Sequence, residues 1–185
     1  GRFKSKGDVL EGDFEGEERV KILLAGAYSY NHKASRLKGQ RGAVMPDDAT
    51  RNLGSYFADF ILKYRGFAFY TDFMGRTCDK PLFDEDPAAY VYTGSGLNIQ
   101  TSWLIKRKWE IALRNSTLFP SDKIRPKAGY NTYNQTTVGL TRYIIGHSLK
   151  VQADLSYDSY GQRNSQIIPD NYNRWQLRFQ VELGL

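Results

Sequence analysis

Hydrophobic and polar residues alternate with a period of two over most of the chain. Val151 and Leu155, for example, share one parity, whereas Lys150 and Asp154 share the other. This period places the two sets on opposite faces of a β-strand, because successive side chains point to opposite sides of the sheet. The alternation predicts eight strands, at residues 19–30, 55–65, 67–76, 97–106, 109–114, 136–145, 149–158 and 174–183.

Short and long connections alternate strictly between these predicted strands. The short ones are Arg65-Gly66, Lys106-Arg107-Lys108 and Gly146-His147, and the long, polar ones are residues 31–54, 77–90, 115–135 and 159–172. An antiparallel meander with this pattern has its tight turns at one end and its long loops at the other. Transmembrane β-barrels have this asymmetry, so the sequence predicts an all-β antiparallel meander of the transmembrane-barrel type.

Aromatic residues recur near both ends of the predicted strands. Two such sets match the girdles that transmembrane barrels place at the two membrane interfaces, where an amphipathic ring contacts both lipid and water. The predicted interface aromatics are Tyr64, Phe67, Trp103, Trp109 and Tyr143 near the tight turns, and Tyr28, Tyr30, Tyr56, Tyr157 and Trp175 near the long loops.

Composition leaves a second type of barrel open. A mean hydropathy of −0.56 is typical of a soluble protein, and the longest apolar run, residues 22–28, is shorter than the ~20 residues of a membrane helix. A soluble lipocalin-like barrel would show the same alternation with its apolar face inward. The one-sided loops, the aromatic girdles and the sustained polar face favour the membrane barrel, whose polar face lines a lumen.

Candidate chemistry is sparse. Cys78 is the single cysteine, so no internal disulfide can form, and His32 and His147 have no neighbouring ligands at metal-binding spacing. Residues 94–96 form a lone Gly-x-Gly without a third glycine. The sequence therefore predicts no enzyme activity, metal or cofactor.

The net charge of +6 can indicate either nucleic-acid binding or attraction of anions into a pore. Many of the cations are dispersed at period two, and the basic clusters lack interleaved aromatics, so nucleic-acid binding is not expected. Positive groups on a lumen wall attract anions instead. The predicted lumen cations are Arg19, Lys21, Lys63, Arg76, Arg114, Lys150, Arg174 and Arg178, and the predicted loop cations are Arg36, Lys38, Arg41, Lys123, Arg125 and Lys127; Lys33 is a further loop cation.

The polar face of the predicted strands is interrupted by three apolar residues, Leu23, Phe57 and Ile61. They indicate partial packing of loops against that face.

Several segments resemble the phosphate-selective porin O and P family of Gram-negative outer membranes. They are residues 1–4 (GRFK), 11–14 (EGDF), 39–42 (GQRG), 58–67 (ADFILKYRGF), 104–114 (LIKRKWEIALR), 143–154 (YIIGHSLKVQAD) and 175–183 (WQLRFQVEL). The resemblance implies a barrel of about 16 strands around an aqueous channel. Residues 1–185 would then be the C-terminal portion of one barrel domain, and residues 8–14 the end of a preceding strand.

The same resemblance implies a bacterial outer-membrane location, contact with outer-membrane lipid, a homotrimer, and passive diffusion of small anions such as phosphate or polyphosphate. Two alternatives stay open. One is a small closed eight-stranded outer-membrane barrel with a structural or adhesive role, and the other is the soluble binding barrel.

Overall fold

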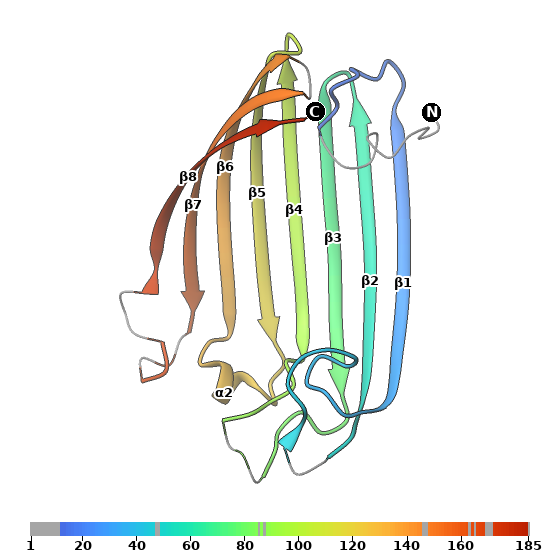
Figure 1. Ribbon diagram of the computed structural model, residues 1–185, viewed down its shortest axis with the longest axis vertical. Helices are drawn as coiled ribbons and strands as arrows, with labels where there is room; N and C mark the ends of the chain where they lie inside the picture. Colours follow the sequence, from blue (N-terminus) through green and yellow to red (C-terminus); the bar gives the residue numbers. More distant parts are fainter. Residues whose placement is uncertain are drawn as a thin grey trace.

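The strands form one antiparallel sheet in sequence order (Figure 1). The computed structural model describes residues 12–46, 49–84, 86, 88–145, 148–162, 164, 166–168 and 172–184. The strands are β1 (Lys21–Ala34), β2 (Arg51–Tyr64), β3 (Phe67–Cys78), β4 (Gly94–Ile105), β5 (Trp109–Pro120), β6 (Thr132–Ile145), β7 (Leu149–Gly161) and β8 (Arg174–Leu183), and a short helix, α2 (Arg125–Ala128), lies between β5 and β6. The predicted all-β antiparallel meander is confirmed.

The sheet is open within the described residues. Each strand pairs with its neighbour in sequence, so β1 and β8 have one partner strand each. The eight strands therefore do not form the small closed barrel that the sequence left as an alternative.

The tight turns lie at one end of the sheet and the long loops at the other, as Figure 1 shows. Arg65 and Gly66 connect β2 to β3 with φ angles of 47° and 84°. Two successive positive φ angles are typical of a type I′ hairpin turn, which fits the twist of the flanking strands. The predicted turn at residues 106–108 is also confirmed, whereas Gly146 and His147 lie outside the described residues.

Most strands extend further toward the long loops than the sequence predicts. β5 continues to Pro120 instead of ending at residue 114, and β6 begins at Thr132 instead of residue 136. The added residues stay paired, with Asn115 opposite Thr136 and Thr117 opposite Asn134. Their polar side chains resemble loop composition, which explains why the alternation misplaces the boundary.

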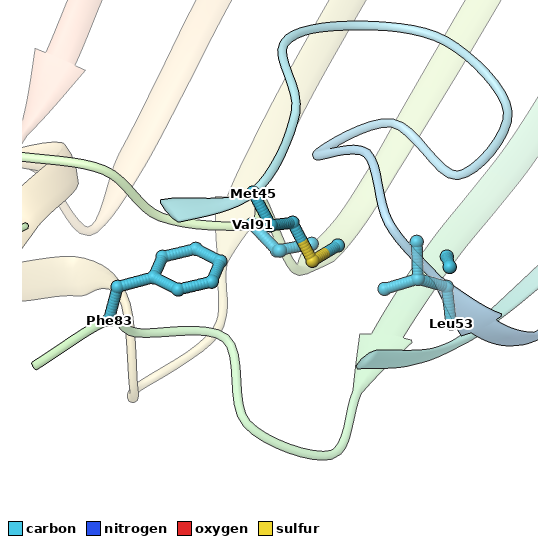
Figure 2. Close-up of a cluster of buried hydrophobic side chains, with 5 residues drawn as sticks. Met45, Leu53, Phe83 and Val91 are labelled. Atoms are coloured by element: carbon cyan, nitrogen blue, oxygen red, sulfur yellow. The ribbon is translucent and has the colours of Figure 1, made fainter. Parts of the chain in front are cut away.

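The long loops have a hydrophobic core of their own. Met45, Phe83 and Val91 pack with Leu53 at the start of β2, and all four are buried (Figure 2). The Arg51 guanidinium carbon lies 4.9 Å from the centre of the Phe83 ring. This loop cluster holds the loop residue Met45 against Phe83 and Val91 of the next long loop.

Residues 12–17 form a strap across the tight-turn end of the sheet. Asp13 is 1% exposed and accepts hydrogen bonds from the N–H groups of Gly66 (2.6 Å) and Glu17 (3.0 and 3.1 Å). The Arg107 guanidinium donates to the carbonyl of Glu15 at 2.7 Å. The prediction that residues 8–14 end a preceding strand is therefore wrong for residues 12–14, which turn back toward two hairpins, while residues 8–11 lie outside the described residues.

Candidate functional site

The two faces of the sheet differ sharply in polarity. The pairing places every second residue of each strand on the same side of the sheet. One row on this side consists of Ile22, Leu62, Phe69, Thr101, Leu113, Val138, Leu155 and Leu177. We call this side the apolar face. The opposite side, the polar face, carries rows such as Lys63, Ala68, Ser102, Ala112, Gly139, Asp154 and Arg178.

Exposure is inverted relative to a soluble barrel. On the apolar face Trp103 is 62% exposed and Phe179 is 72% exposed, whereas on the polar face Ser156 is 0% exposed and Glu110 is 9% exposed. In a water-soluble barrel the apolar side chains would fill the interior. Here the strap lies on the polar side, and the apolar side has no covering segment among the described residues.

The predicted interface aromatics divide into two groups. Nine of the ten belong to the apolar face or its margins: Tyr28, Tyr30, Tyr56, Tyr64, Phe67, Trp103, Trp109, Tyr157 and Trp175. Tyr157 and Trp175 pack with ring centres 4.7 Å apart across the β7–β8 pair. Arg142, which breaks the apolar parity, stacks 4.6 Å above the Trp109 ring at the tight-turn end. A cation on an aromatic ring at this level fits an interfacial position.

Tyr143 is wrong as an interface aromatic. Its side chain is on the polar face, where it is buried, and the hydroxyl donates to Glu110 Oε2 at 2.5 Å. The ring packs against Phe14 of the strap, with centres 5.0 Å apart. Tyr143 is opposite Lys150 in the regular register of β6 and β7, which places it on the polar side, and the register shift comes only between Tyr143 and Ile145. The strap supplies its cover.

Several predicted lumen cations are held in ion pairs. Lys150 pairs with Glu182 (3.2 Å), Arg174 with Asp158 (3.1 Å) and Arg178 with Asp154 (3.5 Å), all across β7 and β8. Lys21 pairs with Glu17 of the strap. Each pair neutralises a charge that the sequence analysis assigned to an anion path. The sequence alone does not show these pairs, because matching the partners requires the cross-strand register.

The other predicted lumen cations have different surroundings. Lys63 is buried and donates to the carbonyl of Gly12 at 3.3 Å. Arg19 precedes β1 and is exposed, so it is not part of the strand wall. Arg114 and Arg178 line one hollow of about 180 Å³ on the polar face, together with Gln100, Gln152 and Asp154, the carboxylate that pairs with Arg178. Among the described residues Arg114 Nε is buried there without a hydrogen-bond partner, so Arg114 offers a donor that a ligand oxygen could satisfy.

The loop cations are brought together only in part. Arg76, Lys123 and Arg125 line a hollow of about 620 Å³ at the long-loop end of β3–β5. Arg125 is paired with Asp122 at 2.6 Å, and Lys127 is exposed in α2. Arg36, Lys38 and Arg41 belong to a separate loop, where the Arg36 guanidinium donates to the carbonyl of Gly42 at 2.9 Å.

Acidic residues form a level of their own on the polar face. Asp59 and Asp72 are directly opposite each other on β2 and β3, and neither has a Lys or Arg partner in the part of the chain that the structure describes. The Asn98 amide donates to Asp72 at 2.9 Å, and the Ser116 hydroxyl donates to Asn98 at 2.8 Å. The wall is therefore mixed in charge.

Sequence reasoning missed one polar network on the apolar face. Asn115, Thr117, Asn134 and Thr136 bond to one another across β5 and β6; the Asn134 amide, for instance, donates to Thr117 at 2.7 Å and to Asn115 at 3.1 Å. The sequence contains Asn-x-Thr at residues 115–117 and again at residues 134–136. Only the strand register shows that these two segments are opposite each other. These four side chains therefore satisfy one another's hydrogen-bonding groups.

No helix in the described ranges is long and apolar enough to cross a membrane. Among the same residues, no three His, Cys, Asp or Glu side chains gather where they could hold a metal ion. Comparison of the chain with protein-family models, with curated proteins and with solved structures returns no match.

Proposed function

We propose that this chain forms part of the wall of a bacterial outer-membrane pore through which small anions diffuse passively. The apolar face would contact lipid, and the polar face would line the water-filled lumen. The resemblance to the phosphate-selective porin O and P family favours phosphate or polyphosphate as the solute.

The inverted exposure carries this proposal. A continuous apolar face of eight strands, with Trp, Tyr and Phe toward its margins, has a large unfavourable contact with water. Contact with hydrocarbon removes that cost, and the hydrogen-bonded Asn115–Asn134 network is compatible with the same environment. The soluble binding barrel is disfavoured by the same observation, since its apolar face would be the covered one.

The unpaired backbone edges of β1 and β8 support closure with further strands. In lipid, every backbone N–H and C=O group of a spanning strand needs a partner, so an open sheet edge is not tolerated there. We infer that both edges pair with strands beyond these eight, which completes a larger barrel.

Anion preference rests on the cations that keep free hydrogen-bonding capacity. Arg114 is the best candidate on the wall, because its Nε is buried without a partner among the described residues and a planar guanidinium can bind two oxygens of a phosphate or carboxylate. Arg178 lines the same hollow but is paired with Asp154. The ion pairs along β7 and β8 reduce the excess charge, so we expect moderate anion preference.

Conductance of the purified full-length protein in planar bilayers tests the proposal. Under a KCl gradient, a reversal potential that favours chloride supports it, and one that favours potassium overturns the anion assignment. Replacing Arg114 with Gln should lower the chloride preference, whereas Lys127→Gln, which changes an exposed cation in α2, serves as a matched control. Absence of any conductance, with the protein soluble without detergent, would instead favour the soluble barrel.

A further inference from the structure

A band of apolar side chains crosses the polar face near the long loops. The pairing aligns Ala27, Phe57, Met74, Gly96 and Leu118 as one row over β1–β5. Phe57 is 40% exposed and Met74 is 45% exposed. Exposed apolar groups on a face that is otherwise polar mark a binding surface more often than scattered surface residues do.

The row is hollowed rather than flat. A cavity of about 290 Å³ is lined by Phe57, Met74, Leu118 and Tyr92, together with Ser55 and Arg76. Gly96 keeps this space open, because a Cβ there would lie 3.0 Å from Leu118 Cδ2 and 3.4 Å from Met74 Cγ. Pockets for small molecules usually occupy about 300–1,000 Å³, so this cavity suits a ligand with a single ring.

One charged group borders the cavity. Arg76 Nε donates to Ser55 Oγ at 3.3 Å, and no carboxylate within the described ranges forms an ion pair with this guanidinium. Its remaining N–H groups can bind a carboxylate in the two-point geometry that guanidinium favours. Burial raises the pKa of the Tyr92 hydroxyl, with a further contribution from its hydrogen bond to Tyr130, so this side chain stays neutral and does not repel an anion.

We propose that this cavity binds small aromatic carboxylates, with the ring against Phe57, Met74 and Leu118 and the carboxylate on Arg76. Inorganic phosphate would satisfy Arg76 but would leave the apolar lining in contact with water. A neutral aromatic alcohol would cover the lining but would leave the guanidinium unpaired. Only a ligand with both parts uses the whole site, and this inference rests on the proposed pore function for the route by which the ligand arrives.

Saturation-transfer NMR with benzoate as the probe measures this binding directly in detergent micelles of the purified full-length protein. We expect saturation transfer to the ring protons of benzoate, competition by other aromatic carboxylates, and little competition by acetate or inorganic phosphate. Because the measurement does not depend on ion flow, the site and the pore are tested separately. Benzoate binding without conductance would contradict the pore alone, and conductance without benzoate binding would contradict the site alone.

A matched pair of glycine variants locates the site. Gly96→Val fills the cavity and should abolish saturation transfer, whereas Gly139→Val places the same side chain on the same face beside the Arg114–Arg178 hollow and should leave it intact. Gly139 has open space, with its nearest contact at 3.8 Å from a Cβ. The Arg76→Gln variant removes the charge without filling space and should weaken benzoate binding at least about tenfold, because hydrogen bonds to charged groups are worth more than neutral ones.

Besides an absence of benzoate binding by the wild type, two results would overturn the proposal. The first is equal benzoate binding by the wild type and by folded Arg76→Gln and Gly96→Val proteins. The second is competition by acetate as effective as that by benzoate analogues, which would show that the ring contributes nothing. If Gly96→Val fails to fold, the Arg76→Gln result and the acetate competition decide the question.

Discussion

The carboxylate of Asp13 accepts a 2.6 Å hydrogen bond from the backbone N–H of Gly66, a residue 53 positions further along the chain. This bond attaches the strap to the β2–β3 turn, and the N–H of Arg65 donates to the carbonyl of Glu17 at 2.9 Å beside it. Replacing Asp13 with Ala leaves buried donors without a partner. We expect a loss of about 1–3 kcal/mol in the free energy of unfolding, measured by urea denaturation in detergent.

A second substitution in the strap separates this bond from general disruption. Glu15 contributes its backbone carbonyl to Arg107, so Glu15→Ala keeps that contact and should change stability by less than about 0.5 kcal/mol. Equal losses for Asp13→Ala and Glu15→Ala would contradict the role assigned to the Asp13 carboxylate.

Gly75 and Tyr56 form a close pair on the apolar face. A Cβ at position 75 would lie 2.1 Å from Tyr56 Cζ, so the ring covers the glycine. Gly75→Ala must displace the ring and should cost about 1–2 kcal/mol through overpacking. Gly26→Ala, whose added Cβ would have its nearest contact at 3.6 Å, should instead stabilise by about 0.5–1 kcal/mol, because glycine within a strand is entropically costly. Chemical denaturation of both variants gives the comparison, and the same sign for both would refute it.

The amide network on β5 and β6 gives a third prediction. Asn134→Ala removes one of the two acceptors of the Asn115 amide (3.1 Å), which keeps its bond to Thr136 (2.9 Å). It also removes the amide that donates to Asn115 and Thr117. We expect a loss of about 1–2 kcal/mol. Asn115→Leu, Asn134→Leu and the double variant form a double-mutant cycle, in which the double variant should lose less stability than the sum of the two single variants because the two amides bond to each other. A loss equal to that sum would contradict the coupling.

Asp158 controls how much charge β8 offers to the lumen. It is buried and accepts from Arg174 at 3.1 Å, Gln135 at 2.8 Å and Tyr133 at 3.1 Å. In Asp158→Asn the Arg174 charge is no longer neutralised, so the reversal potential should move toward stronger anion preference. Asp84→Asn, in the exposed Lys80–Asp84 pair of a loop, should leave it nearly unchanged. Movement toward cation preference in Asp158→Asn would be inconsistent with a lumen position for Arg174.

Asp79 connects the start of β2 to the end of β3 and gives a pH dependence. Burial opposes its ionisation, but hydrogen bonds from the N–H of Lys80 and from Asn52 outweigh burial and hold its pKa below the usual 3.8. A lowered pKa means that this contribution to stability is complete above pH 3.8 and is lost as the pH falls through the lower folded value. NMR titration of the Asp79 carboxyl should give a midpoint below 3.8, and a midpoint at or above 3.8 would contradict these bonds.

The alternation carries most of the information about the fold. Parity alone assigns Val151 and Lys150 to opposite faces of β7, because side chains on a strand point alternately to the two sides whatever the tertiary structure. Strand ends are less predictable, since Asn115 and Thr117 have loop composition and remain in β5 through hydrogen bonds to β6. Those bonds depend on a partner strand whose register no local pattern specifies.

The candidate site is harder to predict than the strands, because each side chain depends on ion-pair and packing partners that only the folded sheet brings together. The sequence shows Arg178 as a lumen cation, but only the register shows that Asp154 lies opposite it. Tyr143 has the spacing of an interface aromatic and is buried because the strap covers it. Phe57 was expected to pack beneath a loop and is instead exposed in the cavity beside Arg76. The sequence thus shows which residues are charged or polar. Which charges are neutralised by an ion pair, and which side chains are covered, is determined by the folded sheet.

The strand order also bears on how the chain folds. Every pairing joins neighbours in sequence, so each new strand closes only the single loop that precedes it, and the entropic cost of closure grows slowly with loop length. No strand has to wait for a distant segment before its register is set. The sheet can grow one hairpin at a time, and an error in a late strand leaves the earlier pairings unchanged.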